Sequence, residues 1–235
     1  MNKSQDRVSA FERKGPKFIS AEQLCADDVI LCYKDKKIDV IGSRIQKVTD
    51  SAYTHAAICI GSGQAAESKI WGVKISDIRD LASRYDHVAI FRQPHAWSVD
   101  RIKTLRLFVK SFVSKGVKYN FSGVLKFRQQ RNEHEQTLPE QLNAFFEGTL
   151  DPPQTEKRRC FCSELVVDCF VKTGFIKPSA AVVYKSNVTS PGALGRDPTS
   201  GTFYGYLSYV ENYQIPETDE FFNATTFNEI FENEI

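Results

Sequence analysis

The chain has 235 residues, 41% of them hydrophobic, and a formal net charge of +2. This length and hydrophobic content suffice for one domain with a sizeable core. All 31 basic residues lie in residues 1–196 with 21 of the 29 acidic ones, so this part carries 31 − 21 = +10, and the other eight acidic residues follow it. The scattered basic residues lack the interleaved aromatic motif of a nucleic-acid-binding protein, which excludes nucleic acid as a partner. The basic part of the chain either favours an anionic membrane surface or forms an ordinary solvated surface.

Residues 1–17 are polar and basic, and we expect them to form a flexible arm. They contain no apolar core of a signal peptide, and no run in the chain approaches the roughly 18 apolar residues of a membrane span. Six cysteines lie mostly within apolar runs without disulfide-scaffold spacing, which is typical of a reducing compartment: Cys25, Cys32, Cys59, Cys160, Cys162 and Cys169. The sequence therefore predicts a cytoplasmic protein, although export without a cleaved signal would leave the same pattern.

Residues 28–33 predict a strand, residues 36–50 a short helix, and residues 53–60 and 64–70 a β-hairpin around a Gly-Ser-Gly loop. The loop length decides which side chains share a face. If all three loop residues are unpaired, His55 lies opposite Lys69, and Glu67 is its diagonal neighbour on the same face, about 7–8 Å away at the backbone. A two-residue loop would place Glu67 on the opposite face.

Residues 88–92 predict another strand, and Ser98 caps a helix with an apolar stripe that ends at Gly116. A charged insert at about residues 127–158 follows. Within it, Thr137 and Glu140 form a capping-box pattern before a short helix over residues 141–146. The insert either borders the site as a lid or is a solvent-exposed segment. His134 has only polar neighbours in the sequence, which predicts a surface position.

Residues 162–170 carry an apolar stripe at helical spacing, and Gly174 ends this helix. Cys162 is therefore expected at a helix N-terminus, where free N–H groups and the helix dipole favour a thiolate and lower a cysteine pKa from about 8.5 into the range of about 3.5–7.5. His55 is the candidate base and Glu67 its orienting carboxylate. The alternative is a small buried core cysteine.

The sequence offers residues for two other kinds of site. The pair Cys160 and Cys162 has no second close Cys/His pair at zinc-finger spacing, so no metal site is expected. His87 and His95 flank the strand at residues 88–92 and are weaker rival bases.

Five short segments follow one another along the chain: Asp28-Val29-Ile30-Leu31, Ser51-x-Tyr53-Thr54-His55-Ala56-Ala57-Ile58, Ala66-Glu67, Gly116-x-x-Tyr119 and Phe161-Cys162-Ser163-Glu164-Leu165-Val166. In this order they resemble the circularly permuted branch of the NlpC-type papain-like superfamily, the YiiX-like proteins. In this branch the His hairpin precedes the Cys helix, and lecithin:retinol acyltransferase-type enzymes share that order. The resemblance covers about residues 18–210. One departure is Asp27-Asp28, where the family usually has Gly-Asp.

The resemblance implies an α+β papain-like fold, in which a small antiparallel sheet packs on the nucleophile helix and on a helix at about residues 99–114. By it, Cys162 is the nucleophile, His55 the base and Glu67 the third polar residue. Tyr119 matches a family tyrosine that lines the cleft or donates to an oxyanion, and Tyr53 shares the His55 face if the strand is extended. The Cys162 N–H would join the oxyanion hole. Residues 211–235 are expected to form an acidic C-terminal tail.

The expected activity is a cysteine hydrolase that cleaves an amide bond, in a cell-wall-type peptide or an N-acyl or lipid amide, through an acyl-enzyme and without cofactor. Two alternatives stay open. One is a lipid-directed thiol acyltransferase or phospholipase, which an apolar surface around the cleft would favour. The other is a non-catalytic exported effector or interaction protein with the same fold.

Overall fold

The computed structural model describes residues 15–35, 49, 51–95, 97–149, 157–177, 180 and 182–231. Apart from Thr49, the helix expected within residues 36–50 lies outside the described residues, as do the Pro152-Pro153 break and most of the expected N-terminal arm. Among those that are described, no helix is long and apolar enough to cross a membrane.

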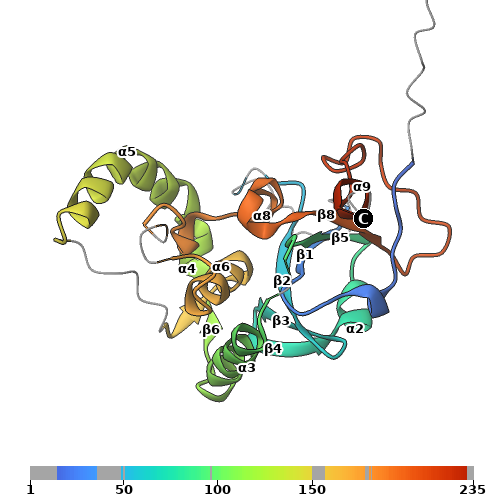
Figure 1. Ribbon diagram of the computed structural model, residues 1–235, viewed down its shortest axis with the longest axis horizontal. Helices are drawn as coiled ribbons and strands as arrows, with labels where there is room; N and C mark the ends of the chain where they lie inside the picture. Colours follow the sequence, from blue (N-terminus) through green and yellow to red (C-terminus); the bar gives the residue numbers. More distant parts are fainter. Residues whose placement is uncertain are drawn as a thin grey trace, which may run out of the picture.

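The centre of the fold is a six-stranded sheet in the order β4-β3-β2-β1-β5-β8, with every neighbouring pair antiparallel (Figure 1). The expected strand, hairpin and second strand are confirmed as β1, β2–β3 and β5, whereas β4 was not foreseen. The strands are β1 (Val29–Tyr33), β2 (His55–Gly61), β3 (Gln64–Lys69), β4 (Gly72–Asp77), β5 (His87–Arg92) and β8 (Thr202–Leu207).

Both faces of the sheet are covered, which is why β1 and β2 are buried along almost their whole length. One face packs against α3 (Val99–Ser114), α6 (Cys162–Lys172) and α8 (Pro191–Arg196). The other face packs against η1 (Ala21–Gln23), α2 (Ile78–Ala82) and α9 (Phe227–Phe231). Since successive strand residues point to opposite faces, these strands contribute to two separate apolar clusters. The α+β fold with a sheet on two helices is as predicted.

The helix α3 follows the sequence pattern closely. The Ser98 hydroxyl accepts the Arg101 N–H at 3.3 Å, which satisfies one free donor of the first turn. Leu105, Phe108 and Phe112 form its buried stripe. Gly116 follows the helix with a φ of +61°, a left-handed conformation that glycine adopts without strain.

The start of β1 explains the Asp27-Asp28 departure. Asp27 has a φ of +87°, which favours glycine but is also open to Asp. Asp28 is buried, and its two carboxylate oxygens accept Arg92 Nε at 2.9 Å and Nη2 at 2.7 Å. The turn that precedes β1 thus keeps a glycine-like geometry without glycine.

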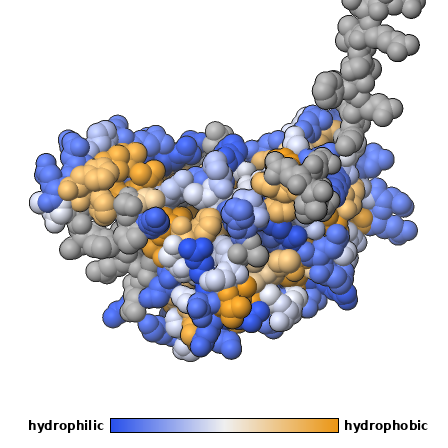
Figure 2. All heavy atoms as spheres, in the orientation of Figure 1, coloured by the Kyte–Doolittle hydropathy of each residue, from blue (hydrophilic) through white to orange (hydrophobic). Residues whose placement is uncertain are grey.

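The insert forms a lobe beside the sheet (Figure 1). It contains α5 (Phe127–Phe146), and the short helix α4 (Phe121–Leu125) directly precedes it. The strands β6 (Lys118–Tyr119) and β7 (Arg159–Cys160), which pair in parallel, lie on either side of it in the sequence. Two short 3-10 helices, η2 (Ser186–Val188) and η3 (Pro198–Ser200), lie later in the chain. Figure 2 shows apolar side chains gathered over α5, and Phe146 at its end is exposed.

Two predictions within the insert are wrong. The capping-box pattern at Thr137 does not begin a helix, because α5 runs through it and the Thr137 hydroxyl donates to Glu133 O, four residues back, at 2.7 Å. His134 is not a surface residue. It is only 6% exposed, and its Nε2 donates to the backbone oxygen of Val183 at 3.2 Å, since α5 packs against the chain that follows α6.

The C-terminal segment expected as an acidic tail packs onto the sheet in its described part, residues 211–231. Ile215 and Phe221 belong to the same apolar cluster as α3 and α6. The buried Asp219 accepts hydrogen bonds from the Tyr206 hydroxyl at 2.5 Å and from His87 Nε2 at 3.2 Å. These contacts tie the segment to β5 and β8 as part of the domain.

Candidate active site

The Cys162 thiol lies at the start of α6, as the apolar stripe predicts. Cys162 is the first residue of the helix, and Phe161 precedes it in an extended conformation. The N–H groups of the first turn have no acceptor within the helix, and that of Ser163 hydrogen bonds to the Cys162 sulfur. A second backbone donor is Ala56 in β2, one residue before the point where the β2–β3 register begins at Ala57.

His55 and Glu67 lie on one face of the β2–β3 hairpin. Ala57 pairs with Glu67 and Ile58 with Ala66, which is the offset that the three-residue loop predicts. The loop itself differs, because Gly61 pairs with Gln64 and an irregularity between Cys59 and Gly61 restores the offset. The result is that His55 Nε2 and Glu67 Oε2 are 2.9 Å apart.

Glu67 is fully buried, and its second carboxylate oxygen, Oε1, binds three donors that the sequence analysis missed. The Ser76 hydroxyl donates to it at 2.6 Å and Arg84 Nη2 at 2.6 Å, while Lys74 Nζ lies at 3.3 Å. Burial alone would raise the pKa of Glu67, but the hydrogen bonds from His55 and Ser76 and the charges of His55 and Arg84 hold it well below its usual range. Glu67 is therefore an anion beside the His55 ring.

Cys162 and His55 are hydrogen bonded to one another. Because Nε2 of His55 binds Glu67, Nδ1 is the ring nitrogen left for the thiol. Burial raises the pKa of Cys162, yet the hydrogen bond and charge of His55 and the N–H groups of Ala56 and Ser163 bring that pKa below its ordinary value. Burial lowers the pKa of His55, while Cys162 and Glu67 raise it overall. Both shifts favour transfer of the thiol proton from Cys162 to His55.

The other thiols behave differently. Cys25 is exposed, and the other five are buried. Burial raises the pKa of Cys160, two residues before Cys162, to about 12, and that of Cys59 also to about 12. Burial likewise raises the pKa of Cys169 well above its usual value. Among the buried thiols, Cys162 alone has a lowered pKa.

The two tyrosines named from the sequence lie in different places. Tyr119 is buried in β6, and the charge of Cys162 contributes to raising its pKa, after burial. The Tyr53 hydroxyl is bonded to Asp219, at 3.0 Å, rather than to Cys162 or His55, and its ring lies in the apolar cluster of α3 and α6. The face argument for Tyr53 was wrong because β2 begins only at His55, so the residues before it do not continue the strand alternation.

A tyrosine that the sequence analysis missed lies beside His55. The Tyr85 ring stacks on the His55 imidazole at an interplanar angle of 10° and a centroid distance of 5.9 Å. Tyr85 follows α2 and is buried. It forms one wall against the imidazole, and no motif in the sequence marks it.

The start of α6 is held by a buried ionic cluster. Glu164 Oε2 accepts the Phe161 N–H at 3.1 Å, and Glu164 Oε1 accepts Lys157 Nζ at 2.8 Å. The same ammonium contacts Asp168 at 3.0 Å, one turn further along α6. These contacts fix the first two turns of α6 and hence the direction of the Cys162 side chain.

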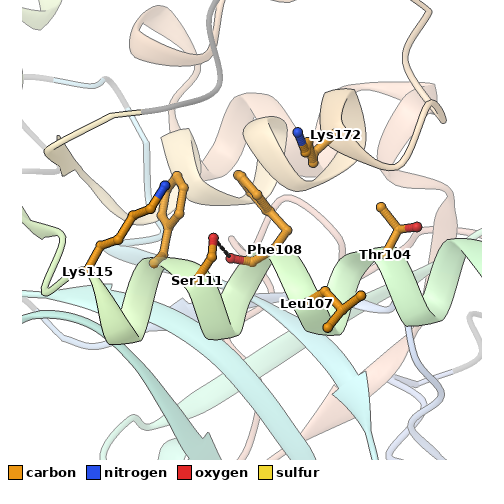
Figure 3. A pocket seen from close by; sticks show the side chains of 7 residues that line it. Thr104, Leu107, Phe108, Ser111, Lys115 and Lys172 are labelled. Atoms are coloured by element: carbon orange, nitrogen blue, oxygen red, sulfur yellow. Dashed lines mark hydrogen bonds between the residues drawn. The ribbon is translucent and has the colours of Figure 1, made fainter.

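The other candidate bases, metal ligands and cavities have less support than the groups around Cys162. His87 is buried and bonded to Asp219, and His95 is exposed, so neither rival base reaches Cys162. Among the described residues, no cluster of His, Cys, Asp and Glu is arranged to hold a metal ion. A hollow of about 340 Å³ lies between α3 and the end of α6 (Figure 3), away from Cys162; Thr104, Leu107, Phe108, Ser111, Phe112, Lys115 and Lys172 line it.

Comparison with known proteins gives two findings. The sequence model of a family described as "Permuted papain-like amidase enzyme, YaeF/YiiX, C92 family" matches residues 39–202, which include His55, Glu67 and Cys162. A curated protein of Escherichia coli (strain K12), named "Probable lipoprotein peptidase YaeF", is 24% identical over 176 residues. That similarity covers 71% of this chain and 62% of the relative, so this chain spans less than two thirds of the relative's length.

Proposed function

Because the chain belongs to the family of permuted papain-like amidases, we propose that it hydrolyses an amide bond with Cys162 as nucleophile, His55 as base and Glu67 as the residue that orients the imidazole. The observation that carries this proposal is the continuous hydrogen-bonded series from the Cys162 thiol through His55 to the buried Glu67 carboxylate. A buried core cysteine would not require a histidine and a carboxylate in line behind it.

The chemistry then follows from the geometry. The Cys162 thiolate attacks the carbonyl carbon, and the negative charge moves to the carbonyl oxygen, where the Cys162 N–H at the helix start can donate to it. The His55 imidazolium gives its Nδ1 proton to the leaving amine as the C–N bond breaks, which leaves a thioester on Cys162. His55 then takes a proton from water, the hydroxide attacks the thioester, and the C–S bond breaks to release the acid product and restore the Cys162 thiolate beside the His55 imidazolium.

Glu67 serves this cycle without touching the substrate. Its Oε2 keeps a proton on His55 Nε2, so that Nδ1 is the nitrogen that exchanges protons with Cys162. The donors Ser76 and Arg84 hold the other oxygen and prevent the carboxylate from turning away. In this proposal Glu67 is a positioning residue.

The experiment that tests the proposal is trapping of the thioester. An activated acyl ester such as p-nitrophenyl acetate should give a burst of nitrophenol equal to the enzyme concentration, and mass spectrometry should map one acetyl group to Cys162. A Cys25→Ser background removes the exposed competing thiol. Acetylation spread over several residues, with no burst, would show that the chain keeps the fold as a non-catalytic interaction protein.

A second candidate function is favoured by one surface feature. Ile70 and Trp71 form the tight β3–β4 turn directly after the site strand, and they are 47% and 92% exposed. Large apolar side chains next to a site suit an acyl chain or a membrane interface. We therefore keep lipid amides and esters as alternative substrates. Turnover that rises steeply with acyl-chain length, and falls after Trp71→Ser, would favour them over short peptides.

A further inference from the structure

Lys69 is a cation on the same side of the hairpin as the proposed catalytic groups. It lies two residues after Glu67 in β3, so the two side chains share a face. Extending the β2–β3 offset by two residues past its last pair, Ala57–Glu67, would bring it opposite His55. Its ammonium lies over the Tyr85 ring, 5.5 Å from the centroid, and the same ring stacks on His55.

Within the described part of the chain, the Lys69 ammonium makes no ion pair. Glu67, the carboxylate whose charge attracts the Lys69 ammonium, is already occupied, because Oε2 binds His55 and Oε1 binds Ser76, Arg84 and Lys74. Lys69 is also partly buried, and burial, with the neighbouring charges of Arg84 and Lys74, lowers its pKa despite the attraction of Glu67. A partly buried ammonium without a counter-ion is an unfavourable arrangement that an incoming anion would relieve.

The charges around the pair Cys162–His55 also favour the binding of an anion. The Cys162–His55 pair is neutral overall whether the shared proton is on sulfur or on nitrogen, and the Glu67 carboxylate is paired with two cations, Arg84 and Lys74. Lys69 brings one more positive charge, so this side of the site is positive before any substrate is present. A site of this sign attracts anions and repels free amines.

We propose that the Lys69 ammonium binds a carboxylate of the substrate beside the amide that Cys162 attacks. This inference rests on the proposed function, and it narrows the substrate class to acyl amides that carry a carboxylate near the scissile bond. The Tyr85 ring supports the ammonium from one side by a cation–π contact and leaves its N–H donors for the carboxylate oxygens.

Two alkylating reagents of matched shape test this without knowledge of the substrate. Iodoacetate and iodoacetamide attack the same thiolate and differ in charge, so the ratio of their second-order rates at Cys162 cancels changes in the thiolate fraction. In a Cys25→Ser background, Lys69→Met should lower the iodoacetate-to-iodoacetamide ratio by about fivefold, the effect of one charge at close range in a partly screened site. Met keeps the apolar stem over Tyr85.

The controls separate this inference from the proposed function. Lys69→Arg should keep most of the ratio, and Lys110→Met, on the exposed face of α3, should leave it unchanged. An unchanged ratio in Lys69→Met, with normal iodoacetamide reaction, overturns the Lys69 proposal alone. If neither reagent modifies Cys162 in the parent protein, the proposed function fails instead. Should Lys69→Met not fold, Lys69→Gln provides the same comparison.

Discussion

Replacing Glu67 by glutamine tests how much of the thiolate depends on one buried carboxylate. A neutral replacement would be mild if Glu67 bound only His55. Its other oxygen, however, accepts hydrogen bonds from Ser76 and Arg84. An amide has one oxygen and one NH₂ group, so it cannot accept from His55 and from these two donors at once. If the amide oxygen faces Arg84, the NH₂ group faces His55 Nε2 and selects the tautomer with the proton on Nδ1, which cannot take the proton of Cys162. The opposite orientation sets the NH₂ group against the donors of Arg84 and Ser76.

The magnitude follows from the lost charged hydrogen bond. A hydrogen bond to a charged group contributes about 1.5–3 kcal/mol, and one pKa unit corresponds to about 1.36 kcal/mol. Glu67 and Cys162 both raise the pKa of His55, so loss of the carboxylate lowers that pKa by about one to two units. The imidazolium then supports the thiolate less, and the pKa of Cys162, which His55 lowers, rises by a similar amount.

The assay is the rate of iodoacetamide reaction at Cys162 from pH 4 to pH 10, in the Cys25→Ser background. The midpoint in Glu67→Gln should lie about one to two pH units above that of the parent, and the two rates should converge near pH 10. The matched control is Glu22→Gln, which removes an exposed carboxylate that also pairs with an arginine, Arg79. Superimposable profiles of parent and Glu67→Gln would refute the role assigned to the carboxylate.

Three further predictions follow from the same contacts. Cys162→Ala and His55→Ala should each abolish turnover of acyl esters, with the double variant no slower than either single one, because the two groups act as a unit; an additive loss would contradict this. Asp219→Asn should lower the free energy of unfolding by about 2–3 kcal/mol in urea titrations at pH 7. The pKa of Asp219 is lowered by its partners, with burial opposing, so this difference should be present above about pH 4 and vanish as the pH falls through the lowered pKa; equal stability at pH 7 would contradict it. Shortening residues 128–156 to a Gly/Ser loop should change selectivity among acyl esters and leave the alkylation rate at Cys162 intact or faster; a large loss of alkylation would show that the lobe supports the thiolate itself.

Much of the fold follows from local patterns. The alternating and stripe-like apolar residues predict β1, the β2–β3 hairpin, β5, α3 and α6, because burial on a sheet or helix requires those periods. The strand β4 escaped prediction because only its first two residues, Gly72 and Val73, are buried. The single helix α5 escaped because Thr137 can bond to a carbonyl within a helix as well as cap one.

The sequence predicts those parts of the site that a single helix or hairpin positions. The helix start gives Cys162 its free N–H donors, and the hairpin offset puts Glu67 on the face of His55. Residues from other elements were not predictable in this way. Ser76 and Arg84 reach Glu67, and Tyr85 reaches His55, only because β4 and α2 fold back beside β3, and no spacing in the sequence encodes that contact.

The failure at Tyr53 and the success at Glu67 have a common physical reason. Alternation assigns a residue to a face only while the backbone is extended and paired, and Glu67 lies inside the paired part of β3, whereas Tyr53 lies before β2 begins. The same limit of the strand has a chemical consequence. Because the β2–β3 register starts at Ala57, the N–H of Ala56 is free to bond to the Cys162 sulfur. The point at which β2–β3 pairing ends is therefore the point at which β2 can meet the first turn of α6, and the thiol lies at that junction.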